Sequence, residues 1–518
     1  MTRVWTLGEL CKEAGIHCPV RVADRLVHGM TSDSRRVREG WLFLAVAGLH
    51  TDGREYVSEA CQNGAMAVIW DDNGCSDTIL PIIESDLPLI RVADGRCTMA
   101  YLWSAWYGHP QRRLRVVGVT GTNGKTTVTT MIHRILEAAG HSCGLIGTVE
   151  TRYPQTALDA GLPVCTDGMT TPDPEILFAI LNGMVRAGAE IVVMEVSSHA
   201  LALRKVEPIC FDLAVFTNLT PEHLDLHKTM EGYYGAKRRL FQKASVAIVN
   251  VDDPYGKRLL QEDLPLEKRL ACSTSLETCR ELSTFCESVC METVRACGEA
   301  GSEFRLLSPV QAMRLYCPMP GAYNVINAAQ AVVSALELGV PLLVVKRALQ
   351  EFEGVRGRLE RVKLPGKADC TVYIDFAHTS DALESLLRTV HGFRAPNERI
   401  VLLFGCGGDR DRSKRAEMAH IASRMADMTV LTSDNSRSES PEQIMKDIVK
   451  GMDKESAYTV IYDRAEAIRY AIQNARSGDI ILLCGKGHEN YEIDKEGIHP
   501  FSETAIVKAA ARDRWGTD

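Results

Sequence analysis

Apolar and polar positions along the chain fall into blocks that are typical of strands and helices in alternation. An apolar run at 114–119 predicts a buried strand, and apolar residues at 128, 131, 132, 135, 136 and 139 then recur with the spacing of one helix face. The turn between these two elements, Thr120 to Thr127, is rich in glycine and threonine. We therefore predict a strand, a glycine-rich turn and a helix in direct succession.

The same alternation on both sides of this unit predicts the fold class. Before it, strands are expected at 41–46 and 65–70, with a helix near 56–62 between them. After it, a helix is expected at 175–187 and strands at 191–196, 213–216 and 244–251. The last third of the chain predicts strands at 372–374, 400–404, 428–431, 459–461 and 480–483, with a capped helix at 441–452. Strands that alternate with helices build parallel sheets, so we expect an α/β protein.

The length indicates more than one domain, because 518 residues exceed what a single core accommodates. We expect three domains. A small N-terminal α/β domain spans 1–95, and a central domain with a P-loop ATPase-like parallel sheet spans 96–355. A C-terminal domain with a Rossmann-like α/β sheet spans 356–518.

Composition narrows the class of protein. With 45% hydrophobic and 24% charged residues the chain is globular, and its net charge of −8 argues against nucleic acid or an anionic membrane as the main partner. The first residues carry charge too early for a signal peptide, and no apolar run approaches the ~20 residues of a membrane span. We expect a cytoplasmic protein without membrane insertion, and a monomer.

The 17 cysteines fit small buried residues in a reducing compartment. Five of them cluster between Cys272 and Cys297, without a C-x-x-C pair and without a histidine among them. This argues against a zinc site. We interpret the segment as a variable stretch near the end of a domain and assign it no function.

The glycine-rich turn has the chemistry of a phosphate loop. Backbone N–H groups of such a turn and of the following helix N-terminus point at an anion. Lys125 is placed to reach the β- and γ-phosphates of a nucleotide, and Thr126 to face Mg²⁺. The loop is a variant, because Val119 stands where the usual pattern has its first glycine. The alternative is a glycine-rich turn with an incidental lysine.

Polar side chains follow several of the predicted strands. Glu195 ends the strand at 191–196 and is a candidate magnesium ligand. His223, after the next strand, is either a second metal ligand or a structural hydrogen bonder. Its neighbour Glu222 is expected to be solvated or to cap a helix. The carboxyl ends of parallel strands share one edge of a sheet, so this edge is the expected binding crevice.

Seven motifs, taken together, resemble the Mur ligase family of ATP-dependent enzymes that form peptide bonds in peptidoglycan synthesis. They are Gly121-Thr-Asn-Gly-Lys-Thr-Thr127, Glu195-Val-Ser-Ser-His199, Thr217-Asn-Leu-Thr-Pro-Glu-His-Leu-Asp225, Ala236-Lys237, Pro320-Gly-Ala-Tyr-Asn-Val-Ile-Asn327, Gly357-Arg-Leu-Glu360 and Asp375-Phe-Ala-His378. Three further motifs resemble the branch that adds a diamino acid as the third residue of the stem peptide. These are Gly407-Gly-Asp-Arg-Asp411, Asp434-Asn-Ser-Arg437 and Gly485-Lys-Gly-His-Glu489.

The resemblance implies a role for each matching residue. ATP and Mg²⁺ would be held by Gly121, Thr122, Asn123, Gly124, Lys125, Thr126, Thr127, Asn324, Asn327, Arg358 and Asp375. The metal ligands would be Thr126, Glu195, His223 and Lys237, the last as a carbamate, and the catalytic group would be Lys125, Lys237, Glu195 and His223. A UDP-muramoyl dipeptide would bind Ser32, Ser34, Thr170, Thr171, Ser197 and Lys205. The diamino acid would bind Arg410, Asp434, Asn435, Ser436, Arg437, Gly485 and Glu489.

The implied reaction joins a diamino acid to the D-glutamate of UDP-N-acetylmuramoyl-L-alanyl-D-glutamate. ATP would first convert the carboxylate to an acyl phosphate, which the amine then attacks, giving ADP and phosphate. Arg437 favours meso-2,6-diaminopimelate, because only that substrate carries a carboxylate at its far end. Two positions depart from the family pattern. Lys205, in the dipeptide set, replaces a usual arginine, which keeps the charge but loses the planar fork. Ser436 replaces a usual proline, and loss of its fixed φ could shift Arg437, so L-lysine and L-ornithine stay open.

Two other functions compete with this prediction. A folylpolyglutamate synthetase-like ligase would share the ATP core, but the segment Thr31-Ser-Asp-Ser-Arg35 suits the muramoyl branch. A nucleotide-binding switch without ligase activity would need only the phosphate loop and Glu195. It would leave Lys237 and the arginines of the C-terminal loops unexplained.

Overall fold

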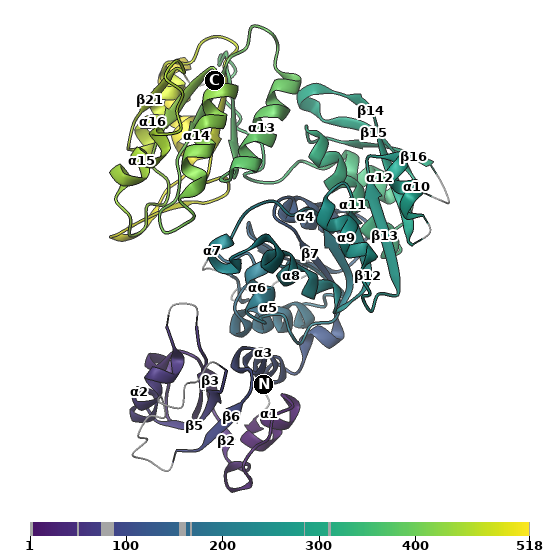
Figure 1. The fold of residues 1–518 in the computed structure, drawn as a ribbon, viewed down its shortest axis with the longest axis vertical. Helices are drawn as coiled ribbons and strands as arrows, with labels where there is room; N and C mark the ends of the chain where they lie inside the picture. Colours follow the sequence, from purple (N-terminus) through teal and green to yellow (C-terminus); the bar gives the residue numbers. More distant parts are fainter. Residues whose placement is uncertain are drawn as a thin grey trace.

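The protein forms three bodies stacked along the long axis of the molecule, each with its own sheet (Figure 1). The computed structural model describes residues 4–48, 51–73, 87–154, 162–165, 168–283, 285–308 and 312–516. The expectation of a three-domain α/β fold is confirmed. Helix α3 (Gly95–Trp106) contacts both α1 (Leu7–Glu13) of the N-terminal body and α5 (Pro174–Arg186) of the central body. These contacts assign α3 to neither body, and the domain boundary near 95 stays a prediction.

The N-terminal body contains a four-stranded parallel sheet in the order β3-β4-β5-β6. The bounds are β3 (Gly29–Thr31), β4 (Trp41–Ala45), β5 (Ala65–Asp71) and β6 (Leu89–Val92). The strands predicted at 41–46 and 65–70 are β4 and β5, and the helix predicted near 56–62 is α2 (Val57–Gln62). A short antiparallel pair, β1 (Trp5–Thr6) and β2 (Leu26–Val27), lies beside α1.

The central body contains a ten-stranded sheet in the order β16-β15-β14-β13-β12-β11-β7-β10-β8-β9. Its strands are β7 (Arg115–Thr120), β8 (Cys143–Ile146), β9 (Thr151–Arg152), β10 (Ile191–Glu195), β11 (Phe211–Phe216), β12 (Ala244–Asn250), β13 (Lys268–Ser273), β14 (Glu287–Ala296), β15 (Ser302–Leu307) and β16 (Ala312–Cys317). The pairs are parallel from β14 to β8, as predicted, but β9, β15 and β16 add antiparallel edges.

The helices of the central body cover both faces of this sheet (Figure 1). They are α4 (Lys125–Ala138), α5, α6 (Ser198–Ala202), α7 (Leu224–His227), α8 (Met230–Phe241), α9 (Pro254–Gln261), α10 (Leu276–Leu282), α11 (Ala322–Glu337) and α12 (Leu342–Gln350). On β7, Val117 and Val119 share a buried cluster with Ile132 of α4, while Val116 joins the opposite cluster with Phe178 of α5. Burial on both faces explains the continuous apolar runs of these strands.

The cysteine-containing stretch 272–297 is part of this sheet. It comprises the end of β13, helix α10 and strand β14, and Cys272, Cys279 and Cys290 are buried among these elements. The cysteines therefore serve as small core residues, in agreement with the interpretation from composition.

The C-terminal body contains a six-stranded sheet in the order β17-β18-β22-β19-β20-β21. The strands are β17 (Glu360–Arg361), β18 (Thr371–Asp375), β19 (Ile400–Phe404), β20 (Met428–Leu431), β21 (Tyr458–Val460) and β22 (Ile480–Cys484), and only β17 runs antiparallel. The helices are α13 (Ser380–Phe393), α14 (Ser413–Met425), α15 (Pro441–Val449), α16 (Arg464–Gln473) and α17 (Glu503–Trp515), and β23 (Tyr491–Asp494) with β24 (Gly497–Pro500) forms a hairpin. All five strands predicted here are present.

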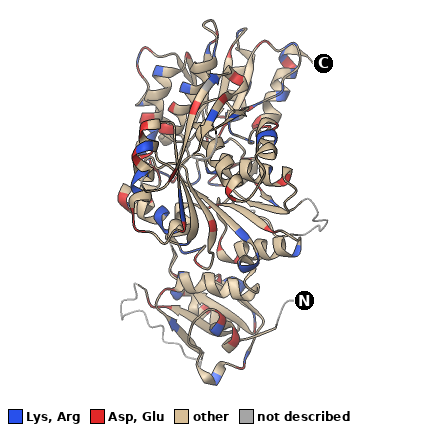
Figure 2. Cartoon of the chain, turned by 90° about the vertical axis from the view of Figure 1, so that its right-hand side faces the viewer, with Lys and Arg blue, Asp and Glu red and all other residues tan. Residues whose placement is uncertain are grey.

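Charged residues of both signs are interspersed over all three bodies (Figure 2). Among the described residues, no helix combines the length and the apolarity that crossing a bilayer requires.

Candidate functional site

The phosphate loop connects the end of β7 to the start of α4, as the sequence predicts. Gly121 has φ +151° and Gly124 has φ +87°, which L side chains rarely adopt. A Cβ at Gly121 would lie 1.8 Å from Thr217 Oγ1, and one at Gly124 would lie 2.6 Å from Asn327 Oδ1. The loop also donates from the Asn123 backbone N–H to Asn218 Oδ1 at 2.9 Å. The end of β11 thus fixes the shape of the loop.

Lys125 and Lys237 converge on this loop from two helices. Lys125 Nζ donates to the carbonyl oxygens of Gly121 (2.9 Å) and Thr122 (2.8 Å). Lys237 Nζ of α8 donates to the same Gly121 oxygen at 2.7 Å and lies 4.5 Å from the ring centroid of Tyr233. Burial lowers the pKa of both lysines, and the charge of Lys125 lowers the pKa of Lys237 further. The site therefore disfavours two ammonium groups at once.

Glu195 is buried at the end of β10 and accepts three hydrogen bonds. The donors are Thr126 Oγ1 (3.1 Å), the Thr148 N–H (2.8 Å) and Thr148 Oγ1 (2.9 Å). A carboxylate and a hydroxyl beside a phosphate loop form the all-oxygen donor set that suits Mg²⁺. The residues present therefore fit this ion.

His223 precedes α7 with φ +56°, and its ring contacts Glu222, His199 and Tyr233. Its Nε2 lies 3.5 Å from Glu222 Oε2, and its ring packs edge-on to that of His199 with 4.7 Å between centroids. Burial lowers the pKa of His223 to about 3, and the charges of Lys125 and Lys237 act in the same direction. The imidazole is therefore neutral and able to act as a metal ligand.

The expectation that Glu222 is solvated or caps a helix is wrong. Its carboxylate accepts from His378 Nε2 of the C-terminal body at 3.2 Å. Burial raises the pKa of Glu222, but the hydrogen bond from His378 and the neighbouring positive charges outweigh burial and lower it. No local pattern around 222 signals this contact, because its partner lies in another body. Glu222 thus connects the crevice of the central sheet to the C-terminal body.

The predicted nucleotide contacts from the rest of the chain reach the same loop. Asn327 lies against Gly124 and donates to Asn324 Oδ1 at 3.2 Å. Arg358 Nη2 donates to Thr126 Oγ1 at 3.3 Å across the body boundary. Asp375 accepts from the backbone N–H of Leu359 (2.6 Å) and so orients the Arg358 loop.

A further residue of the C-terminal body touches the phosphate loop and was not identified from the sequence. Asp381, in the first turn of α13, accepts from Asn123 Nδ2 at 3.0 Å and from Thr220 Oγ1 at 3.4 Å. An acidic residue in the first turn of a helix is ordinary helix chemistry. Only the packing of α13 against the loop distinguishes this one.

Part of the predicted dipeptide-binding set lies next to Glu195. Thr171 Oγ1 donates to the Glu195 carbonyl oxygen at 3.0 Å and accepts from the Ser197 N–H at 3.0 Å. Thr148 Oγ1, which donates to Glu195, is hydrogen-bonded to Thr170 Oγ1 at 3.0 Å, and Lys205 Nζ is paired with Asp173 at 2.7 Å. Ser32 is exposed and Ser34 is buried in the N-terminal body, where Ser34 Oγ donates to Glu59 at 2.5 Å.

The predicted diamino-acid residues gather at the carboxyl ends of strands in the C-terminal sheet. Asn435 Nδ2 donates to Glu489 Oε2 at 2.9 Å, and a Cβ at Gly485 would lie 2.5 Å from Asp434 Oδ2. Arg437 has φ +52°, and its Nη1 donates to the Gly408 carbonyl oxygen at 2.8 Å. Burial lowers the pKa of Arg437, and the nearby charge of Arg410 adds to this effect. Ser436 is buried between these residues.

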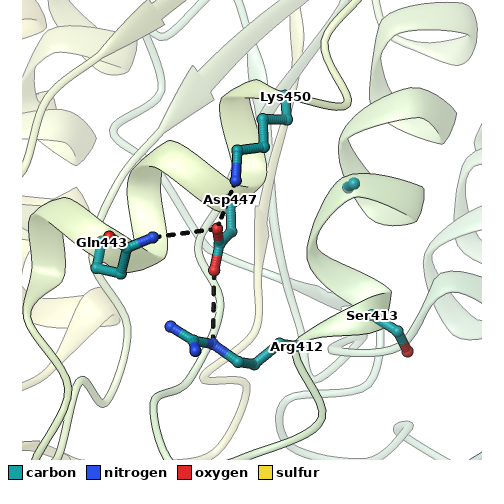
Figure 3. Close-up of a pocket in the computed structure, with 6 residues that line it drawn as sticks. Arg412, Ser413, Gln443, Asp447 and Lys450 are labelled. Atoms are coloured by element: carbon teal, nitrogen blue, oxygen red, sulfur yellow. Dashed lines mark hydrogen bonds and ion pairs between the residues drawn. The ribbon is translucent and has the colours of Figure 1, made fainter.

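Two hollows lie near these groups. One of about 250 Å³ opens beside Thr126 and Glu195, and it is also lined by Arg134, Arg152 and Arg356. The other, of about 420 Å³, lies between α14 and α15 (Figure 3). There Asp447 accepts from Gln443 (3.2 Å) and pairs with Lys450 (3.1 Å) and Arg412 (3.6 Å). The first hollow belongs to the candidate site, whereas the second is lined by polar side chains that pair with one another.

Three family models match the chain in order. They are described as "Mur ligase family, catalytic domain" at residues 26–107, "Mur ligase middle domain" at 119–335 and "Mur ligase, glutamate ligase domain" at 357–487.

Full-length relatives show the same family. The chain is 37% identical to the UDP-N-acetylmuramoyl-L-alanyl-D-glutamate--2,6-diaminopimelate ligase of Syntrophomonas wolfei, covering 98% of this chain and 99% of that protein. The ligase of the same name from Chlorobium phaeobacteroides is 40% identical, with 93% and 91% covered.

Solved structures agree with the fold. A structure of a ligase of that name has a TM-score of 0.63 at 28% identity, with 99% of both chains covered. The MurF ligase of Thermotoga maritima in complex with ADP has a TM-score of 0.57 at 16% identity, with 94% of this chain and 96% of that chain covered, and at this identity shows the fold alone. With the relatives above, the comparisons cover nearly the whole chain, and the chain belongs to the Mur ligase family.

Proposed function

We propose that the protein is a cytoplasmic, monomeric ligase that uses ATP and Mg²⁺ to add meso-2,6-diaminopimelate to the D-glutamate of UDP-N-acetylmuramoyl-L-alanyl-D-glutamate. The observation that carries the proposal is the contact of Arg358 with Thr126 at 3.3 Å. It joins a phosphate loop in the central body to a body whose loops present two arginines and Glu489. The names of the full-length relatives support the same reaction.

The first step transfers the γ-phosphoryl group of ATP to the γ-carboxylate of D-glutamate. The loop N–H groups and Lys125 bind the phosphates, and Lys125 exchanges its present acceptors, the Gly121 and Thr122 carbonyls, for phosphate oxygens. Thr126, Glu195 and His223 would hold Mg²⁺, which would supply positive charge against the negative charge of the phosphates. Thr148 holds the Glu195 carboxylate in a fixed orientation through two hydrogen bonds.

Lys237 takes part in this site as a carbamate. Its buried amine has a strongly lowered pKa, and a neutral amine is the form that reacts with CO₂. In that reaction the N–C bond forms, one C=O π bond of CO₂ opens and one proton leaves to solvent, so a neutral amine becomes an anionic oxygen ligand. The exchange suits a pocket that already contains Lys125.

The second step joins the amine to the acyl phosphate. The amine nitrogen attacks the acyl carbon, the bond from that carbon to the phosphate oxygen breaks, and the ammonium proton passes to solvent or to the leaving phosphate. Arg358, Glu222 and Asp381 keep the two bodies in contact during this step and limit the entry of water.

The substrate is chosen by charge in the C-terminal loops. Arg437 and Arg410 suit the second carboxylate of diaminopimelate, and Glu489 suits an ammonium group. Serine in place of the usual proline at 436 does not release Arg437. The backbone N–H of Arg437 donates to the Ile493 carbonyl oxygen at 3.1 Å, and its guanidinium donates to the Gly408 carbonyl oxygen. The hairpin thus holds the loop in place of a proline.

The test is release of phosphate from ATP by the purified protein with the UDP-muramoyl dipeptide and a panel of amines. Turnover with meso-diaminopimelate well above that with L-lysine or L-ornithine is expected. Turnover with L-lysine or L-ornithine but not with meso-diaminopimelate would show that the active amine, and not diaminopimelate, is the substrate. Turnover with none of them, or only with a folate acceptor and glutamate, would refute the proposal.

A further inference from the structure

Lys486 is fully buried in the C-terminal body, with 0% of the residue exposed, although lysine is rarely found inside proteins. It follows β22, and its Nζ donates to Asn435 Oδ1 at 2.9 Å and to the Tyr491 carbonyl oxygen at 3.0 Å. Both acceptors are neutral oxygens. The buried charge therefore holds two segments together, the 434–437 loop and the start of the β23–β24 hairpin.

The hydrogen bond from Lys486 restricts the orientation of the Asn435 side-chain amide. Its Oδ1 also accepts from the Ile493 N–H at 3.0 Å. An amide oxygen has two lone pairs, and both are now used by donors. The amide consequently has one orientation, in which Nδ2 points away from Lys486 and donates to Glu489 Oε2 at 2.9 Å.

Glu489 is in turn held through both carboxylate oxygens. Besides the Asn435 contact, its Oε1 lies 3.5 Å from the hydroxyl of Tyr491, whose backbone carbonyl is the second acceptor of Lys486. We propose that Lys486 is a positioning residue for recognition of the amine substrate. By locking the Asn435 amide and the Tyr491 backbone, it directs the Glu489 carboxylate toward the ammonium group of the diamino acid. This inference rests on the proposed function.

The surrounding charges fit this role. Burial raises the pKa of Asp434, but the charges of Lys486 and Arg464 outweigh burial and lower it. Lys486 also lowers the pKa of Glu489, which burial and Asp434 raise. Lys486 thus favours the ionised form of the carboxylate that it helps to position.

The experiment compares Lys486→Met with the wild-type enzyme by steady-state kinetics. The KM for meso-diaminopimelate should rise about tenfold or more, because a charged hydrogen bond that holds the binding group is lost, while the KM values for ATP and the UDP-dipeptide stay within about twofold. Lys508→Met, at an exposed position of α17, is the matched control and should change none of the three KM values. An unchanged KM for the diamino acid in Lys486→Met would overturn the inference.

A double-mutant cycle separates positioning from a general structural effect. Because Lys486 acts partly through Asn435, Lys486→Met should raise the KM for the diamino acid by a clearly smaller factor in the Asn435→Ala enzyme than in the wild type. Effects that multiply would overturn the inference. Thermal melting and ATP binding verify folding, and Lys486→Gln, which retains a donor, serves in the same comparison if the methionine variant does not fold. A wild-type enzyme that is inactive with every diamino acid would refute the proposed function instead.

Discussion

Lys125 and Lys237 donate hydrogen bonds to one and the same acceptor, the carbonyl oxygen of Gly121, at 2.9 and 2.7 Å. Both amines are buried, so each ammonium raises the cost of the other. The repulsion between the two ammonium groups disappears if Lys237 is neutral, and it becomes an attraction to Lys125 if Lys237 carries a carbamate. The lysine that shows no distinctive spacing in the sequence is thus distinctive in its surroundings.

The first prediction concerns this carbamate. Lys237→Ala should still bind ATP but lose activity by at least about a hundredfold, because an anionic ligand of the metal is missing. Acetate or propionate at millimolar concentrations should restore part of the activity by occupying the vacated space. Phosphate release with and without the added carboxylate measures the effect.

Lys257→Ala is the control, since Lys257 pairs with Glu281 on the surface. It should be active and insensitive to added carboxylate. Full activity of Lys237→Ala would disprove the carbamate, and a variant that stays inactive with every short carboxylate tested would count against it.

The second prediction concerns the contact of α13 with the phosphate loop. Asp381→Ala removes the acceptor of Asn123 Nδ2, so the C-terminal body loses one of its contacts with the loop. The KM for ATP should rise about three- to tenfold, in line with the loss of one interbody hydrogen bond, while the melting temperature changes little.

The control is Glu384→Ala on the same helix, where the glutamate pairs with Arg388 at the surface. Steady-state kinetics over a range of ATP concentrations distinguishes the two variants. Equal KM values for Asp381→Ala and the wild type would show that this contact does not contribute to nucleotide binding.

The third prediction uses two glycines with nearly the same backbone. Gly124 has φ +87° and Gly140 has φ +82°, so alanine is strained at either site by about 1–2 kcal/mol. A Cβ at Gly124 would also meet Asn327 Oδ1 at 2.6 Å, whereas one at Gly140 meets nothing within 4 Å.

Both variants should therefore melt at a lower temperature, but only Gly124→Ala should lose ATP binding. Calorimetric titration with ATP measures the difference. Normal ATP affinity in Gly124→Ala would mean that the loop adapts and that the phosphate site is less rigid than its contacts indicate.

Most of the fold could be predicted because strands buried on both faces leave a plain signal. The run from Ile191 to Glu195 is entirely buried, and its apolar residues predict β10 directly. The antiparallel edge of the central sheet leaves a weaker signal. In β15 and β16 exposed Arg305 and Arg314 interrupt the apolar positions, as alternation at a sheet edge requires.

The residues of the candidate site also fall into those that local sequence pattern predicts and those that it does not. Thr126 and Glu195 follow strands, so local pattern predicts them as binding residues, and they are 3.1 Å apart. Glu222 and Asp381 act through partners in another body, and local pattern carries no information about such partners. Lys237 lies on a helix with other basic residues, and only the family resemblance singled it out.

The last prediction tests the choice of amine at Arg437. Its guanidinium donates to the carbonyl oxygens of Gly408 and Asn435, and the charge of Arg410 lies close enough to lower its pKa. Arg437→Ala should raise the KM for meso-diaminopimelate roughly ten- to a hundredfold, the cost of one charged contact, and leave the KM for ATP unchanged. L-lysine, which has no second carboxylate, should lose little, so the preference between the two amines narrows. Competition between the two substrates measures this ratio directly.

Arg424→Ala, in the last turn of α14, is the control. If diaminopimelate use survives Arg437→Ala unchanged, the specificity depends on a different residue, and Arg410 is then the next to change.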